Sequence, residues 1–185
     1  MRRGAGRGAL GLLLVALSFP GAAAAQPAGR WEAGGGVGFL TGGDRLDGVA
    51  AGVLIDGGWR PSTRLALVVE ASRHRVTQDV GFFEAEVTFD AVLIGPRVRF
   101  RAAGIPVFAH LLAGAGRAGV SARTTMPVVA VGEDSATEGA VQIGGGLEAP
   151  LTRRLHLRAG LDYRRATGDT PLDQLRVSTG VVLLF

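Results

Sequence analysis

A glycine-rich run is the first place where the spacing of residues suggests chemistry. Gly114-Ala-Gly-Arg-Ala-Gly119 has the spacing of a dinucleotide-binding loop, and Asp134 follows where such folds carry the carboxylate that binds a ribose. This chemistry requires a helix directly after the glycines, whereas residues 120–127 are rich in β-branched types and end in proline. The chain beyond Gly119 is also too short to complete a doubly wound sheet. We therefore expect no dinucleotide site and no other cofactor.

Three histidines are the second candidates, because an imidazole can act as a metal ligand or a general base. His74, His110 and His156 lie far apart in the sequence, without the close ligand spacing of a zinc site, and the chain has no cysteine. A serine nucleophile needs a base within hydrogen-bond reach, and no Gly-x-Ser-x-Gly elbow is present. We expect no metal site and no catalytic residue, although the alternation of the three segments places all three histidines on inward faces.

Composition limits the fold and the partners. Glycine makes up 30 of the 185 residues, and its cost inside helices argues against an all-α protein. The hydrophobic fraction of 47% is too high for a disordered chain. All 20 cationic residues are arginine, but the net charge of +4 is small and does not indicate nucleic acid as a partner.

The first 25 residues have the plan of a secretory signal peptide. Three arginines within the first seven residues precede an uncharged run, residues 9–19, and the small residues Ala23, Ala24 and Ala25 offer a cleavage site. As a helix the uncharged run rises only about 16 Å, too little for a membrane anchor. We expect residues 1–25 to be removed between Ala25 and Gln26. Residues 26–185 then form one domain, and the loss of three arginines lowers its net charge from +4 to +1.

The elements that must position any site are strands. Eight segments alternate with a period of two, and most are as long as a tilted strand needs to be to cross a bilayer. They are residues 30–40, 49–60, 65–75, 85–100, 107–116, 138–149, 155–165 and 174–185. Short connections at 61–64, 101–106 and 150–154 alternate with longer ones at 41–48, 76–84, 117–137 and 166–173. This rhythm predicts an all-β fold, an eight-stranded antiparallel up-and-down transmembrane β-barrel.

Splitting each segment by parity separates an apolar face from a face that carries charges of both signs. The charged faces hold Glu32, Asp56, Glu70, Glu148 and Asp162 together with Arg60, Arg97, Arg99, Arg158, Arg164 and Arg176. A buried charge without a partner is costly. We therefore predict that Glu70, Glu148 and Asp162 pair with Arg158, Arg164 and Arg176 across the lumen. Eight strands enclose only enough room for side chains, so we expect these pairs to plug the barrel.

Aromatic residues are expected in two girdles at the membrane interfaces, outside the strand centres. The first, on the short-turn side, comprises Trp31, Trp59, Phe100, Phe108 and Phe185. The second, on the long-loop side, comprises Phe39, Phe82, Phe83, Phe89 and Tyr163. The segment 85–100 does not alternate cleanly, because Val87 and Phe89 have the opposite parity to Val98 and Phe100. This predicts a β-bulge within Ala91–Pro96.

Two stretches carry a family resemblance. The terminal segment Gln174-Leu-Arg-Val-Ser-Thr-Gly-Val-Val-Leu-Leu-Phe185 and the hairpin Pro150-Leu-Thr-Arg-Arg-Leu-His-Leu-Arg-Ala-Gly-Leu-Asp-Tyr163 resemble the small eight-stranded outer-membrane β-barrel domain family, related to opacity-type porins. The resemblance implies a monomer in the cell outer membrane, surrounded by lipid. It also implies that the barrel-assembly machinery reads Phe185, with Val181 and Leu183 on the same face. It implies no particular activity.

A structural or surface-interaction role through the long connections, above all 117–137, is therefore the expected function, with an unidentified extracellular ligand. One alternative is an enzyme that modifies outer-leaflet lipid, since barrels of this kind include lipid A deacylases. Those enzymes place serine two residues after histidine on one strand face, a spacing absent after all three histidines, which leaves only a pair across strands. The other alternative is a narrow pore.

Export can be tested directly. If residues 1–25 are cleaved after Ala25, protein extracted from membranes should begin at Gln26, because Ala23 and Ala25 supply the small residues that the peptidase requires. Intact-mass measurement checks this expectation. A mass that includes the first 25 residues would refute cleavage while leaving the fold prediction untouched.

Overall fold

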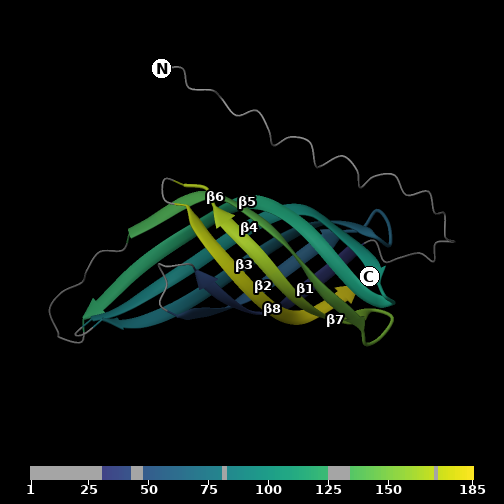
Figure 1. The fold of residues 1–185 in the computed structure, drawn as a ribbon, viewed down its shortest axis with the longest axis horizontal. Helices are drawn as coiled ribbons and strands as arrows, with labels where there is room; N and C mark the ends of the chain where they lie inside the picture. The colour runs from purple at the N-terminus through teal and green to yellow at the C-terminus, as the bar shows by residue number, and fades with distance from the viewer. Residues whose placement is uncertain (1–30, 43–47, 81–82, 125–133, 169–170) are drawn as a thin grey trace, which may run out of the picture.

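The chain forms a closed barrel of eight strands in a computed structural model that describes residues 31–42, 48–80, 83–124, 134–168 and 171–185. Figure 1 shows the strands wound obliquely around one axis. The strands are β1 (Trp31–Gly42), β2 (Val49–Trp59), β3 (Leu65–Val80), β4 (Phe83–Ala102), β5 (Ile105–Thr124), β6 (Asp134–Pro150), β7 (Leu155–Ala166) and β8 (Leu172–Leu184).

Every strand pairs antiparallel with the next in sequence, and β1 closes the barrel on β8. This confirms the predicted all-β, eight-stranded, up-and-down architecture, and each predicted segment overlaps one strand. The described residues include no helix that is both long and apolar enough to cross a membrane. The glycine run from Gly114 to Gly119 lies inside β5, paired on both sides, so the helix that a dinucleotide site requires is replaced by strand.

Closure of the barrel depends on glycine where strands approach closely. Gly36 and Gly180 face each other across the β1–β8 seam. A Cβ atom added to Gly36 would overlap the carbonyl oxygen of Thr179, and one added to Gly180 would overlap that of Gly35. A larger residue at either position would force the two strands apart, since backbone atoms on both sides cannot move independently.

Four strands exceed their predicted lengths by at least four residues each. β3 has 16 residues, β4 and β5 have 20 each, and β6 has 17, and Figure 1 shows this side of the barrel reaching beyond the other strands at the loop end. Most of the predicted connection 76–84 is therefore strand. The predicted connection 117–137 is strand up to Thr124 and again from Asp134, and its remainder lies outside the described residues.

The predicted bulge within Ala91–Pro96 is wrong. The β3–β4 register runs without a break from Leu65↔Val98 to Val80↔Phe83, and the β4–β5 register is the same on both sides of residues 95 and 96. Only the β4–β5 pairing stops there, where Pro96 lacks an N–H group to donate. The parity mismatch has another cause: Phe89 faces the lumen, where it packs with Leu40 and Ala50.

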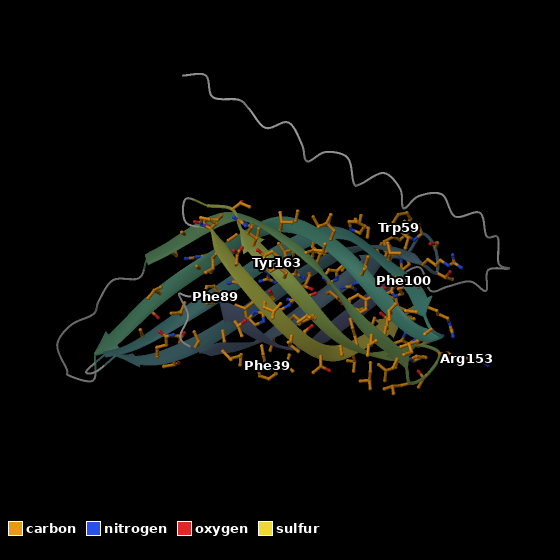
Figure 2. All side chains as sticks on the ribbon, in the orientation of Figure 1. Phe39, Trp59, Phe89, Phe100, Arg153 and Tyr163 are labelled. Atoms are coloured by element: carbon orange, nitrogen blue, oxygen red, sulfur yellow. The ribbon has the colours of Figure 1, made fainter. Side chains whose placement is uncertain are left out.

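Two residues of the predicted aromatic girdles do not lie at the membrane interfaces, because they face the lumen. Phe89 and Phe108 are buried inside the barrel. The outward aromatic residues are Trp31, Trp59, Phe100 and Phe185 toward the short turns, and Phe39 and Tyr163 toward the loop end. Figure 2 shows Trp59 and Phe100 near one end of the barrel with Arg153, and Phe39 and Tyr163 nearer the other. Phe82 and the side chain of Phe83 lie outside the described residues.

The outer surface carries an apolar belt, which ends sharply toward the long connections. On β3 the outward residues change from Ala71 to Arg73, and on β4 they change from Val92 to Asp90. Arg73 and Asp90 are opposed across the two strands and form an exposed ion pair of 2.7 Å. The extended parts of β3 to β6 therefore rise above the belt with polar residues on their outer face.

The inward position of Phe89 can be tested by comparing two alanine substitutions. Phe89→Ala should lower the free energy of unfolding by about 3–5 kcal/mol, because it leaves a cavity between Leu40 and Ala50. Phe39→Ala should cost clearly less, because the Phe39 side chain is half exposed on the outer face. Urea unfolding of both variants in lipid vesicles measures the difference. Equal losses would contradict the assigned orientation.

Candidate functional site

The charged lumen is the candidate site. All the acidic and arginine side chains predicted to face inward lie inside the barrel, and only Arg99 and Arg158 retain slight exposure. Their contacts divide them into two clusters, one toward the loop end and one toward the short turns.

Arg176 is the centre of the loop-end cluster. Its Nη1 donates to Glu70 Oε1 on β3 at 2.7 Å, and its Nη2 lies 2.7 Å from Asp162 Oδ2 on β7. The Arg176 side chain on β8 is almost completely buried. One guanidinium therefore joins two carboxylates from opposite sides of the lumen, the geometry in which a planar fork of donors is most effective.

Arg164 belongs to the same cluster but is paired differently. Its Nε donates to Gln142 Oε1 at 3.0 Å and its Nη2 donates to Ser72 Oγ at 3.1 Å, so both of its hydrogen-bond partners are neutral. The nearest carboxylate oxygen, Glu70 Oε1, is 3.6 Å away. Arg164 is thus a buried cation with only a loose ionic partner.

The short-turn cluster is built from arginines that each bridge two acids. Arg97 contacts Glu32 at 3.0 Å and Asp56 at 2.7 Å. Arg99 bridges Glu32 and Glu148, whereas Arg158 bridges Asp56 and Glu148. These contacts connect β1, β2, β4, β6 and β7 across the interior, and they include pairs between strands that are not neighbours in the sheet.

Phe108 fills the space between two of these arginines. Its ring centroid lies 5.5 Å from the Arg97 guanidinium carbon and 5.3 Å from that of Arg158, within the range of a cation–π contact. This role of Phe108 differs from its predicted place at the membrane interface. The signal was available: Phe108 has the same parity as His110, which was expected to face inward.

Two of the ion pairs join residues that lie directly opposite each other on neighbouring strands, and the β7–β8 pair is of the kind that strand spacing makes the safest to predict. Asp162 lies opposite Arg176 in the β7–β8 register, and Glu148 lies opposite Arg158 in the β6–β7 register. Both pairs are in ionic contact. Of the three arginines in the predicted network, Arg164 is the one that does not obtain a carboxylate within hydrogen-bond distance.

Two inward glycines make room for the aspartates, a pairing that the parity of the segments alone does not identify. Gly34 lies opposite Asp56, and Gly144 lies opposite Asp162. A Cβ atom on either glycine would overlap the Oδ1 atom of the facing aspartate. The short carboxylates can therefore lie flat against the barrel wall and still reach an arginine.

The histidines do not converge on one site. His110 Nε2 lies 2.9 Å from Asp162 Oδ1 in the loop-end cluster, and His156 Nδ1 lies 3.1 Å from Glu148 Oε1 in the short-turn cluster. His74 is fully buried near the loop-end cluster. Within the ranges that the structure describes, no histidine hydrogen-bonds a serine hydroxyl, and no three His, Asp or Glu side chains are grouped as a metal site would require.

A closed eight-stranded barrel with an apolar outer belt, interfacial aromatics and a lumen crossed by ion pairs defines the class of outer-membrane β-barrels. The chain belongs to the outer membrane protein beta-barrel domain family, whose model matches residues 9–185.

Solved structures with the same fold include proteins of several bacteria. Ail, the attachment invasion locus protein of Yersinia pestis, is 13% identical, with a TM-score of 0.62 over 85% of this chain and 99% of Ail. Neisserial surface protein A is 16% identical, with a TM-score of 0.65 over 86% and 100%. The N-terminal barrel of Pseudomonas aeruginosa OprF is 14% identical, with a TM-score of 0.52 over 85% and 99%. No curated protein matches the sequence.

The central place of Arg176 predicts a large effect of its removal. Arg176→Ala should lower the free energy of unfolding by about 3–5 kcal/mol, because Glu70 and Asp162 would remain buried without the arginine that lies closest to both. Arg73→Ala is a matched control: it removes a comparably close arginine–aspartate pair that is exposed to solvent, and it should have little effect. Urea unfolding in vesicles compares the two. An equally small loss for both variants would contradict a structural role for the cluster.

Proposed function

We propose that this protein is a non-conducting barrel of the outer membrane with a structural role, and that it meets extracellular partners through the extended part of its sheet. The observation that carries the proposal is the pairing of the lumen charges. Two layers of ion pairs centred on Arg97 and Arg176 cross the lumen at different depths. An ion that passes through would have to separate buried pairs, at a cost of several kcal/mol.

The surface role rests on the parts of β3 to β6 that rise above the apolar belt. Their outer face carries Arg73, Arg75, Glu86, Asp90 and Arg117 around a groove of about 260 Å³. Arg73 and Asp90 form an ion pair, and Arg117 donates to Ser135 Oγ at 2.9 Å. A paired, polar sheet above the membrane can offer a partner a preformed surface, which lowers the entropic cost of binding.

Export and assembly complete the proposal. The protein reaches the outer membrane after cleavage between Ala25 and Gln26, a region outside the described residues, and the assembly machinery reads Phe185 together with Val181 and Leu183. These three side chains lie exposed on the outer face of the terminal segment, where a partner can reach them. The folded protein is a monomer surrounded by outer-membrane lipid.

Conductance tests the closed lumen. Purified, refolded protein should give no steady channels in planar bilayers, because both ion-pair layers block the path and eight strands leave little free bore. Arg176→Ala should raise the frequency of brief openings, since it removes one layer. Reproducible, long-lived channels from the unmodified protein would overturn the proposal in favour of a narrow pore.

Phe185 tests the assembly signal. Deleting Phe185 should leave protein unassembled in the periplasm, but the deletion also removes the two backbone hydrogen bonds that pair Phe185 with Trp31. Phe185→Ala retains these bonds and should still reduce the assembled fraction strongly. Phe100→Ala, which changes a similarly exposed phenylalanine at the same short-turn end of the barrel, is the control. The assembled fraction is read from heat-dependent migration of outer-membrane extracts. Normal assembly of Phe185→Ala would eliminate the signal role.

A further inference from the structure

The loop end of the lumen contains a pocket of about 360 Å³ that the ion-pair network does not fill. Its walls are mainly apolar and include Val87 and Phe89 from β4, Ala118 from β5, Ala140 from β6 and Leu172 from β8. Arg164 lies among these lining residues although it is 97% buried, with an exposed fraction of only 3%. The pocket is thus a mainly apolar recess with the buried guanidinium of Arg164 in its wall, and Asp90, Arg117 and Glu138 are among its other lining residues.

The electrostatics of Arg164 differ from those of the arginines that cross the lumen. Arg97, Arg99, Arg158 and Arg176 each have at least one carboxylate oxygen within 3.1 Å. Both oxygens of Glu70, the nearest acid to Arg164, already accept from Arg176, at 2.7 and 3.0 Å. The hydrogen bonds that Arg164 makes to other described residues come from its Nε and Nη2 atoms, and both acceptors are neutral. A buried cation in this state gains from an additional anion.

We propose that this pocket binds an amphipathic monocarboxylate, a medium-chain fatty acid, with its carboxylate on Arg164 and its hydrocarbon chain against Phe89 and Leu172. The volume is at the small end of the range for ligand pockets, which suits one short chain. A single negative charge fits better than a phosphate dianion, because Glu70 lies beside the guanidinium. Glu138, which also lines the pocket, accepts from the Gly168 N–H at 3.1 Å.

This site lies on the loop side of the Arg176 layer, so binding does not depend on whether the lumen conducts. Failure of the closed-lumen proposal and failure of this one are therefore separate results: channel recordings test the first, and equilibrium binding tests the second.

The experiment uses the full mature chain in lipid nanodiscs, which avoids competition from detergent. Octanoate labelled with ¹³C at the carboxyl carbon is titrated in, and its carboxyl signal is compared with that in empty nanodiscs. Saturable binding is expected. Arg164→Gln should weaken it by about tenfold or more, the equivalent of one charge-assisted hydrogen bond. Octanol, which lacks the carboxylate, should compete poorly.

Two further variants keep the test decisive if Arg164→Gln fails to fold. Ala118→Trp places a bulky ring beside Phe89, its partner across β4 and β5, and should abolish binding without changing any charge. Arg165→Gln is the matched control, because Arg165 is the next residue but its side chain is half exposed and near Asp173. Its binding should equal that of the unmodified protein. No saturable signal above empty nanodiscs, or equal binding by the Ala118→Trp variant, would overturn the proposal.

Discussion

The small enclosed lumen is the constraint on which the rest of this structure depends. Alternation along each strand sends every second side chain inward, and eight strands leave just enough space for those side chains. Charged residues in that space lose water, so each must find an opposite charge or a neutral hydrogen-bond partner inside. The clusters around Arg97 and Arg176 satisfy this requirement, and the inward glycines at 34 and 144 supply the room that the facing aspartates need.

The sequence predicts the architecture well because both of its signals are local. A period of two identifies strands, and alternating short and long connections identify an up-and-down order. The upper strand ends could not be predicted as well. On β3, for example, the apolar outer face stops at Ala71, whereas the strand continues to Val80 with polar residues outside. The alternation of apolar residues marks only the part of each strand inside the apolar belt, whereas hydrogen bonding between neighbouring strands extends the sheet beyond the belt.

The errors inside the barrel have a single origin, the assumption that the lumen is uniformly polar. Phe89 and Phe108 were assigned to the exterior because they are aromatic, yet one packs with Leu40 and Ala50 and the other stacks between two arginines. The false bulge in β4 followed from the same assumption. Contacts between neighbouring strands, such as Asp162 with Arg176, follow from register, but Arg97 reaches Glu32 across the lumen, and that distance depends on the closure of the whole barrel.

Arginine explains how so few residues hold this interior together. Arg97, Arg99, Arg158 and Arg176 each contact two carboxylates from different strands, which requires a planar group with several donors fixed in direction. A lysine ammonium is a compact, strongly hydrated charge and would lose more on burial while fixing less geometry. Each acid in turn meets at least two arginines in the short-turn cluster, so the contacts form a continuous network instead of separate pairs. The chain contains arginine and no lysine. In the lumen, arginine is the cationic residue that can bridge two carboxylates in this geometry. Arg164, whose hydrogen-bond partners are neutral, is where this network meets the apolar pocket at the loop end.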